Sequence, residues 1–533
     1  MRRIGRREFL ELAAAGAATA AGVPLLAGCS RKPAGRSSAE AGPPDVAAAP
    51  PPPPGPDAAP VRESGYFATN FGIDQALLLR TIGRGLSKGG DHCEVFLQHK
   101  LADSIAFEDG QVNDAYARVD IGAGVRVLAG DQTGYAFTED LSPESLRRAA
   151  ETAAAIAAAA AGSGPDRLTP VEVPALYPRE PMWSPASPAG KLALVDQVGK
   201  RVAAGDASVI KAAVRFRAED DVVLVANSDG TFVEDRRPMT FLYATCTAEK
   251  NGRRETNWFS RSRRAGPEFY TPEVLDLLAG EAVKRTLLLF DAVTPPAGEM
   301  PVVLAPATSG ILLHEAMGHG FEADFNRKGI SIFASMLGRK IAQDFVTIVD
   351  SALEPGSRGA VGVDDEGTPG RRTVLVDKGV LVSYLHDRIS AKHYGVERTG
   401  NGRREDFRFP PIPRMRVTFM EPGPHAPPEI LSSVKRGLYA IDFSNGEVTI
   451  GAGDYSFYVK TGYLIEDGKL TSPVKDVNLI GNGPDSLAKV DMVGGDMELD
   501  GGTWTCGKDG QSVPVGLGLP TVRIAAITVG GVR

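Results

Sequence analysis

The sequence has little of what typifies nucleic-acid-binding or metal-rich proteins. Its 533 residues carry a formal net charge of −7 and include no long basic stripe, which argues against nucleic acid as a partner. It has only 4 cysteines and 7 histidines, so any cluster of these residues is informative. Its hydrophobic content of 43% is ordinary for a soluble protein.

The chain also lacks an apolar run that is long enough, and poor enough in alanine, to predict a membrane span. Residues 1–29 instead predict a twin-arginine signal, because Arg6-Arg7 precedes an Ala/Gly-rich segment. This segment ends in Leu26-Ala27-Gly28-Cys29, which resembles a lipoprotein cleavage box. We therefore expect export to the periplasm or cell surface, with a lipid anchor at Cys29. An uncleaved anchor or a misassigned start codon is the alternative.

Residues 30–61 are rich in proline and alanine and predict a disordered, extended linker. If Cys29 is lipidated, Cys93, Cys246 and Cys506 remain. A disulfide between Cys93 and Cys246 is possible in an oxidising compartment, although nothing in their surroundings argues for one.

The rest of the chain predicts an α+β protein that divides near Pro295. We expect an α+β domain over 62–295 and a β-rich, barrel-like domain over 296–533 that contains the metal-motif helix. The helices are expected at 72–88, 143–162, 189–204 and 272–290, and strand patterns occur at 91–96, 121–128 and 222–225. Two hairpins are expected in the second domain, 372–376 with 381–385 and 457–466 with 469–475.

The segment His314-Glu315-Ala316-Met317-Gly318-His319 places two imidazoles and one carboxylate within six residues. Imidazole is a good ligand for zinc, and a carboxylate beside a metal can activate a bound water. On a regular helix, however, residues five apart lie roughly 140° apart. We therefore expect the helix to distort or end near Gly318, using the backbone freedom of glycine. Histidines that merely bond to backbone at a helix start are the simpler alternative.

A catalytic zinc needs a third protein ligand, and the strongest candidate is Cys506 in a glycine-rich segment near the C-terminus. Lys508 could help to keep this thiol ionised. The alternative is a buried, inert thiol, which is the usual state of a lone cysteine.

Several sequence blocks, in order, resemble the TldD/PmbA family of metalloproteases. They are LLHEAMGHGFEADFNRKG from Leu312, DDEGTPG from Asp364, TGNGRRE from Thr399, PRMR from Pro413, VKDVNLIGNG from Val474 and CGKDGQSVPVGLGLPTVRI from Cys506. Looser matches, GVRVLAGDQTGYAFTEDLS from Gly124 and VLVANSDGTFVEDRR from Val223, extend the resemblance to most of the chain after about residue 65.

The resemblance implies that His314, His319 and Cys506 hold one divalent metal, in the first place Zn²⁺, and that Glu315 activates water. It implies unfolded or small peptides as substrates. It also implies a dimer, formed either with a second copy or with an inactive TldE/PmbA-like paralogue. Iron or another divalent ion could use the same ligands.

Two other functions remain open: a peptide-binding or maturation factor that does not cleave, and a structural lipoprotein stabilised by metal. Asp364, Asp365 and Glu366 could bind a cation or a peptide amine, or form an exposed turn. Arg403 and Arg404 could hold a substrate carboxylate or pair with nearby acids. We interpret His386 and His393 as structural residues.

Overall fold

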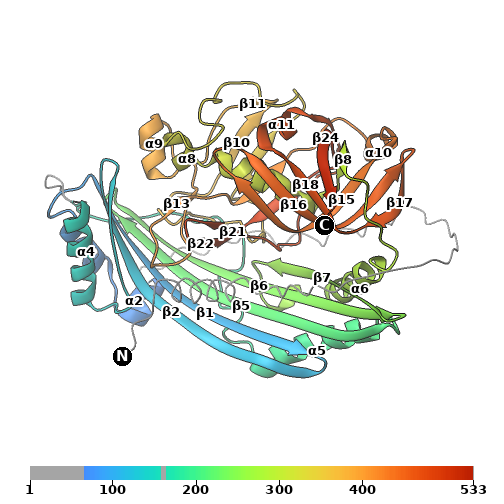
Figure 1. Ribbon diagram of the computed structural model, residues 1–533. Helices are drawn as coiled ribbons and strands as arrows, with labels where there is room; N and C mark the ends of the chain where they lie inside the picture. Colours follow the sequence, from blue (N-terminus) through green and yellow to red (C-terminus); the bar gives the residue numbers. More distant parts are fainter. Residues whose placement is uncertain (1–64, 158–163, 532–533) are drawn as a thin grey trace, which may run out of the picture. The chain divides into compact units, whose positions relative to one another are not determined.

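The structure is a computed structural model that describes residues 65–157 and 164–531 (Figure 1). The predicted signal at 1–29 and linker at 30–61 lie outside these residues. In the part of the chain that is described, no helix has the length and apolar character to cross a membrane.

The first part of the chain forms an antiparallel sheet of long strands. The order across the sheet is β3-β2-β1-β5-β6-β7, and a short strand, β4, pairs in parallel with β6. The strands are β1 (His92–Glu108), β2 (Gln111–Ala129), β3 (Gln132–Thr138), β4 (Thr169–Pro170), β5 (Val209–Asn227), β6 (Thr231–Lys250) and β7 (Arg253–Arg263). Asp109-Gly110 and Asn251-Gly252 connect neighbouring strands with positive φ angles, as tight hairpins require.

The strands extend well beyond the segments predicted from sequence. The predicted segment 121–128 is the buried end of β2, whereas residues 111–119 of the same strand are exposed. Because hydrophobic alternation marks only strand segments with a buried face, the exposed half carried no signal. The prediction was therefore right in type and too short in extent.

In the described part of the chain, five helices pack on this sheet in two groups. Helices α3 (Gln75–Gly85) and α4 (Pro143–Ala157), with the short α2 (Tyr66–Phe71), cover a core with β1 and β2. Helices α5 (Pro188–Ala204) and α6 (Pro272–Leu288) cover a second core with β5 and β6, and a 3₁₀ turn, η1 (Pro267–Phe269), precedes α6. All four predicted helices are present. Residues 158–162 of the second prediction lie outside the described residues.

The last part of the chain contains a closed barrel of five strands. These are β8 (Gly298–Leu304), β15 (Arg436–Thr449), β16 (Asp454–Glu466), β18 (Val477–Asn482) and β24 (Val522–Gly531). The order β15-β8-β24-β18-β16 closes because β16 also pairs with β15. β17 (Lys469–Val474) extends from β16, and β19 (Val490–Val493) pairs with β24. The predicted hairpin at 457–475 is confirmed by β16 and β17.

A second sheet has the order β11-β10-β9-β14-β23-β20. Its strands are β9 (Ile348–Ser351), β10 (Arg372–Asp377), β11 (Val380–Leu381), β14 (Val417–Met420), β20 (Glu498–Leu499) and β23 (Gly516–Leu519). The predicted hairpin at 372–385 is only partly correct, because strand pairing stops at Leu381. The chain then turns away, and the Leu385 amide bonds to the carbonyl of Phe321 instead.

Two small hairpins and several short helical segments complete the description. The hairpins are β12 (Gly402–Arg403) with β13 (Ile412–Pro413) and β21 (Thr505–Lys508) with β22 (Gln511–Pro514). The helical segments are η2 (Ala307–Gly310), α7 (Ile311–Leu313), η3 (His314–Gly318), η4 (His319–Phe321), α8 (Ala323–Arg327), α9 (Arg388–Tyr394), α10 (Pro427–Ser432) and α11 (Gly483–Ala488). The predicted fold class, an α+β part followed by a β-rich barrel that carries the motif helix, is confirmed.

A buried ionic network joins the first sheet to loops of the second half. Arg126 pairs with Glu94 at 2.7 Å and with Glu366 at 2.6 Å, and Arg404 also pairs with Glu94. All four side chains are at most 1% exposed. Such charges are retained only where opposite charges and hydrogen bonds compensate their desolvation.

The disulfide that the sequence left possible between Cys93 and Cys246 is not formed. Cys93 and Cys246 are both buried and free, and they belong to the two different helix-covered cores of the sheet. Their strands, β1 and β6, are separated by β5, so the two thiols cannot meet.

Candidate metal centre

The motif helix changes its geometry at His314. After the α-helical turn of α7, η3 is a π-helical turn, and η4 is a 3₁₀ turn that ends at extended Glu322. The amide of His319 donates to the carbonyl of His314, so the hydrogen bond spans five residues. A π turn therefore brings residues five apart onto one face. The two imidazole rings lie 5.1 Å apart, and the predicted distortion of the helix is confirmed.

The glycines were predicted to let the backbone leave the helical conformation, and this explanation is wrong. Gly318 has φ −57° and ψ −47°, which any residue can adopt. Its small size is what the structure needs, because a Cβ on Gly318 would lie 2.2 Å from Met415 Sδ. A Cβ on Gly320 would lie 2.5 Å from the ring of Phe333. The glycines let the helix pack closely against its neighbours.

Cys506 reaches the motif helix from the β21–β22 hairpin. Its Sγ lies 3.3 Å from His319 Nε2, and the donor atoms of His314, His319 and Cys506 lie within 4.8 Å of one another. All three side chains are at most 4% exposed. The fully buried Arg414 fixes the hairpin by donating to the Cys506 carbonyl at 2.6 Å. The fold thus brings together three donors from two distant segments.

These residues fit a divalent metal. Both ring nitrogens of His314 are buried and have no hydrogen-bond partner among the described residues, which is unusual for buried polar atoms. Burial raises the pKa of the Cys506 thiol, but His319 and His314 outweigh burial and lower the pKa well below its ordinary value. Two imidazoles and a thiolate form a set of donors that suits zinc.

Glu315 lies beside the three donors. Its Oε2 is 3.6 Å from His319 Nε2, and 21% of its side chain is exposed. Burial raises the pKa of Glu315 above its ordinary value, although the neighbouring histidines oppose this. A carboxylate with a raised pKa is a better proton acceptor near neutral pH.

One neighbour of the proposed ligands, Glu322, was missed from sequence, and Lys508 was assigned a different role. Glu322 Oε2 accepts a hydrogen bond from His319 Nδ1 at 2.9 Å. With the proton on Nδ1, the lone pair of Nε2 is the one that can bind a metal. Lys508 pairs with Glu322 at 3.1 Å and with Asp324 at 2.7 Å. The predicted role of Lys508 beside the thiol is therefore wrong, because its ammonium group forms ion pairs behind His319. The contact between Glu322 and His319 could have been predicted from sequence, because Glu322 follows His319 by three residues.

The acidic segment 364–366 is not an exposed turn. Asp364, Asp365 and Glu366 are all buried. Asp365 pairs with Arg237 at 2.6 Å, and Asp364 accepts hydrogen bonds from the backbone amides of Glu366, Thr368 and Gly402. These carboxylates already have protein partners and hold the two halves together.

The remaining polar candidates also have partners in the protein. Arg403 donates to the carbonyls of Met415 and Pro514, and Arg404 pairs with Glu94. Burial lowers the pKa of His386 to about 4, and its Nδ1 faces Ser390. His393 is exposed. None of these four lies in the group of His314, His319 and Cys506.

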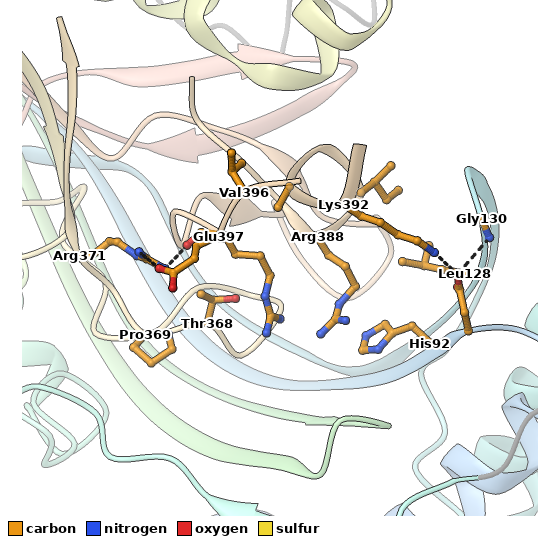
Figure 2. Close-up of a pocket in the computed structure, with 14 residues that line it drawn as sticks. His92, Leu128, Gly130, Thr368, Pro369, Arg371, Arg388, Lys392, Val396 and Glu397 are labelled. Carbon is orange, nitrogen blue, oxygen red and sulfur yellow. Dashed lines mark hydrogen bonds and ion pairs between the residues drawn. The ribbon is translucent and has the colours of Figure 1, made fainter. Parts of the chain in front are cut away.

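A separate cavity of about 570 Å³ lies between the start of β1 and helix α9 (Figure 2). It is lined by none of the metal-motif residues. Its cationic side chains are paired at the walls: Arg388 with Asp229, Lys392 with Asp91, and Arg371 with Glu397 at 2.9 Å. The charges of the cavity are largely compensated, and it does not contribute to the metal centre.

Comparisons with known proteins agree with this architecture. The chain matches the PmbA/TldA metallopeptidase domain 1 over residues 93–157, the central domain over 183–290 and the C-terminal domain over 297–531. A Haemophilus influenzae protein named metalloprotease TldD homolog is 38% identical over 83% of this chain and 93% of its own length. A zinc metalloprotease TldD homolog from Saccharolobus solfataricus is 33% identical over 46% of this chain and 55% of its own.

The fold is shared with TldE from Thermococcus kodakarensis, at a TM-score of 0.67 and 20% identity, over 85% of this chain and 99% of that one. The extent of the match to the Haemophilus protein, together with the three family domains, decides the assignment. The chain belongs to the PmbA/TldA metallopeptidase family.

Proposed function

We propose that this protein is a metal-dependent peptidase in which His314, His319 and Cys506 hold one divalent ion, in the first place zinc. The observation that carries the proposal is the convergence of the three donor atoms within 4.8 Å, beside the carboxylate of Glu315. When bound, the metal supplies a Lewis acid that polarises a peptide carbonyl and acidifies a water. The name of the Saccharolobus relative supports zinc.

Glu315 is the general base in this proposal. Its Oε2 accepts a proton from the attacking water and delivers it to the nitrogen of the leaving amine. Its partial exposure of 21% lets water and substrate reach it, whereas the three metal-binding side chains are shielded from solvent. Glu322 orients the ring of His319 through Nδ1.

We propose extended, unfolded or small peptides as substrates. The β21–β22 hairpin that carries Cys506 forms a sheet of only two strands within the described residues. A peptide could therefore pair with a hairpin edge through its backbone, which would give tolerance for different side chains. A dimer with a second copy, or with an inactive TldE-like relative, is part of the same proposal and is supported by the fold shared with TldE.

We also propose that the protein is exported by the twin-arginine route and lipid-anchored at Cys29, with domains over 62–295 and 296–533. The support for export is Arg6-Arg7 and the segment that ends in Cys29. Metabolic labelling with a radioactive fatty acid tests the anchor. Label should enter the wild-type protein and be absent from Cys29→Ser.

The test of function compares the purified protein with Glu315→Gln, each with its metal content determined, on a pool of unfolded peptides. We expect Glu315→Gln to retain metal and to lose cleavage by 100-fold or more, since a general base contributes about 10²–10⁴-fold. Equal cleavage by both proteins would refute the role of Glu315. If neither cleaves, alone or with a co-expressed relative, the protein is a binding or structural factor.

A further inference from the structure

Within the described residues, the helices cover only one face of the long sheet. Along β6, Leu242, Ala244 and Cys246 point into the core under α5 and α6. Side chains alternate between the faces of a strand, so Phe241 and Tyr243 point to the opposite face. Figure 1 shows α5 on one side of this sheet and β21 and β22 on the other.

Aromatic and cationic side chains share this opposite face. Cross-strand pairs place Arg217 opposite Phe241 and Arg215 opposite Tyr243, and directly paired residues lie on the same face. The ring of Tyr243 stacks between Phe241, at 6.0 Å, and Trp258 of β7, at 5.0 Å. We call these five residues, Arg215, Arg217, Phe241, Tyr243 and Trp258, the aromatic face.

The aromatic face is partly open. Its two arginines are exposed, and its three rings are only half-buried. Lys211 of the same strand pairs with Glu108, whereas Arg215 and Arg217 have no acidic partner at ion-pair distance among the described residues. Glu219 follows on the same face of β5, and Asp442 and Asp500 lie near Tyr243 and Arg358. Asp442 already pairs with Arg285, and Arg215 and Arg217 are the exposed cations of the face that can pair with a ligand.

This face adjoins the segment that carries Cys506. Ser260, the cross-strand partner of Tyr243, bonds through Oγ to Thr503 Oγ1 at 3.0 Å. The guanidinium of Arg358 lies 6.0 Å from the Phe241 ring and donates to the carbonyl of Trp504 at 2.9 Å. Thr503 and Trp504 are within three residues of Cys506, so the aromatic face lies beside the segment that carries this cysteine.

We propose that the aromatic face binds the substrate peptide away from the cleaved bond and selects peptides that carry acidic side chains beside aromatic ones. The inference rests on the proposed peptidase function and adds a substrate class to it. Arg215 and Arg217 are two residues apart on one strand, which is about 6.6 Å. An extended peptide repeats its side chains at the same interval, so a Glu-X-Glu segment matches the two guanidinium groups. An adjacent aromatic side chain stacks on the half-buried rings.

The test measures peptide binding on the metal-loaded Glu315→Gln protein, so that binding is separate from cleavage. The probes are two dye-labelled decapeptides that share one phenylalanine and differ only in Glu-Ala-Glu against Lys-Ala-Lys, followed by fluorescence anisotropy. We expect the acidic peptide to bind about tenfold more tightly, with the preference lost at high salt. Each of Arg215→Gln and Arg217→Gln should weaken it by about threefold, since an exposed ion pair contributes modestly.

Arg254→Gln is the matched control, because Arg254 is an exposed arginine at the far end of β7 that already pairs with Glu249. It should bind like the parent protein, and all variants should unfold at the same temperature. Trp258 adds a direct signal: the acidic peptide should change tryptophan emission in the parent and not in Trp258→Phe.

Equal affinities for the two peptides, or affinities unchanged in both arginine variants, would overturn the inference. The inference would also be overturned if the arginine variants sedimented differently from the parent protein but bound the peptides with the same affinity. That result would assign the face to contact with a second chain. Because binding is measured without turnover, selective binding by an inactive wild-type protein would refute the peptidase proposal alone.

Discussion

The ion pairs of Lys508 with Glu322 and Asp324 are expected to set the metal affinity of this protein. Cys506 and Lys508 are two residues apart on β21 and both point inward. Lys508 therefore connects the strand that carries one proposed ligand to the residue that orients another. We predict that Lys508→Met lowers zinc affinity by about 10- to 100-fold, the usual effect of removing a residue that supports a metal ligand.

The effect on stability follows from the same contacts. Lys508→Met leaves the buried Glu322 and the partly buried Asp324 without this cation, and breaking a buried pair costs about 3–5 kcal/mol. Glu322→Gln keeps a hydrogen-bond acceptor for His319 Nδ1, and Lys508 retains Asp324 at 2.7 Å. The expected loss of stability is therefore smaller, about 1.5–3 kcal/mol for one charge-assisted bond.

Competition with a chelator measures the zinc affinity, and urea unfolding of the metal-free proteins measures the stability. Lys508→Arg is the conservative control, since it keeps the charge and should recover part of the metal affinity. Unchanged zinc affinity in both Lys508→Met and Glu322→Gln would refute the reasoning. A loss of stability with normal metal affinity would show that these residues only support the fold.

Two further outcomes follow from close packing and from buried charge. Gly318→Ala should lower the free energy of unfolding by about 1–3 kcal/mol in urea titration, because its Cβ would overlap Met415. Gly83→Ala in α3 has open space around the new Cβ and should not destabilise. Burial opposes ionisation of Glu94, yet Arg126 and Arg404 hold its pKa below the ordinary value. The ion pairs of Glu94 therefore contribute their full free energy of stabilisation above about pH 4.3, and this contribution is lost as the pH falls and Glu94 is protonated. In Glu94→Gln, the unfolding temperature should fall less steeply than in the wild-type protein as the pH is lowered below about 4.3. An equally steep fall in both proteins would contradict this.

The chemistry of the site could be read largely from local sequence, whereas its geometry could not. The spacing of His314 and His319 is incompatible with a regular helix, so it required a distortion, and the π turn of η3 supplies it. The local pattern did not show that Gly318 is needed for space beside Met415. That contact joins residues almost a hundred positions apart, and hydrophobic periodicity carries no information about such pairs.

The partners of the buried ion pairs could not be predicted from local sequence either. The sequence placed Asp364 to Glu366 and Arg404 in recognisable polar segments, but their partners on the first sheet could not be inferred. Glu366 meets Arg126, and Arg404 meets Glu94, only because the tertiary fold lays these loops on the sheet. Similarly, the exposed half of β2 carries no apolar alternation, so its length was not predictable from pattern.

The segment from Thr503 to Lys508 links the first sheet to the motif helix. Thr503 contacts Ser260 of β7, the carbonyl of Cys506 accepts from Arg414, and Lys508 pairs with Glu322. One short stretch therefore contacts a strand beside the aromatic face, supplies a proposed metal ligand and supports another. The position of Cys506 depends on the first sheet, on the loop that carries Arg414 and on the end of the motif helix. A proposed ligand 187 positions from His319 can thus be held without a disulfide or a local motif.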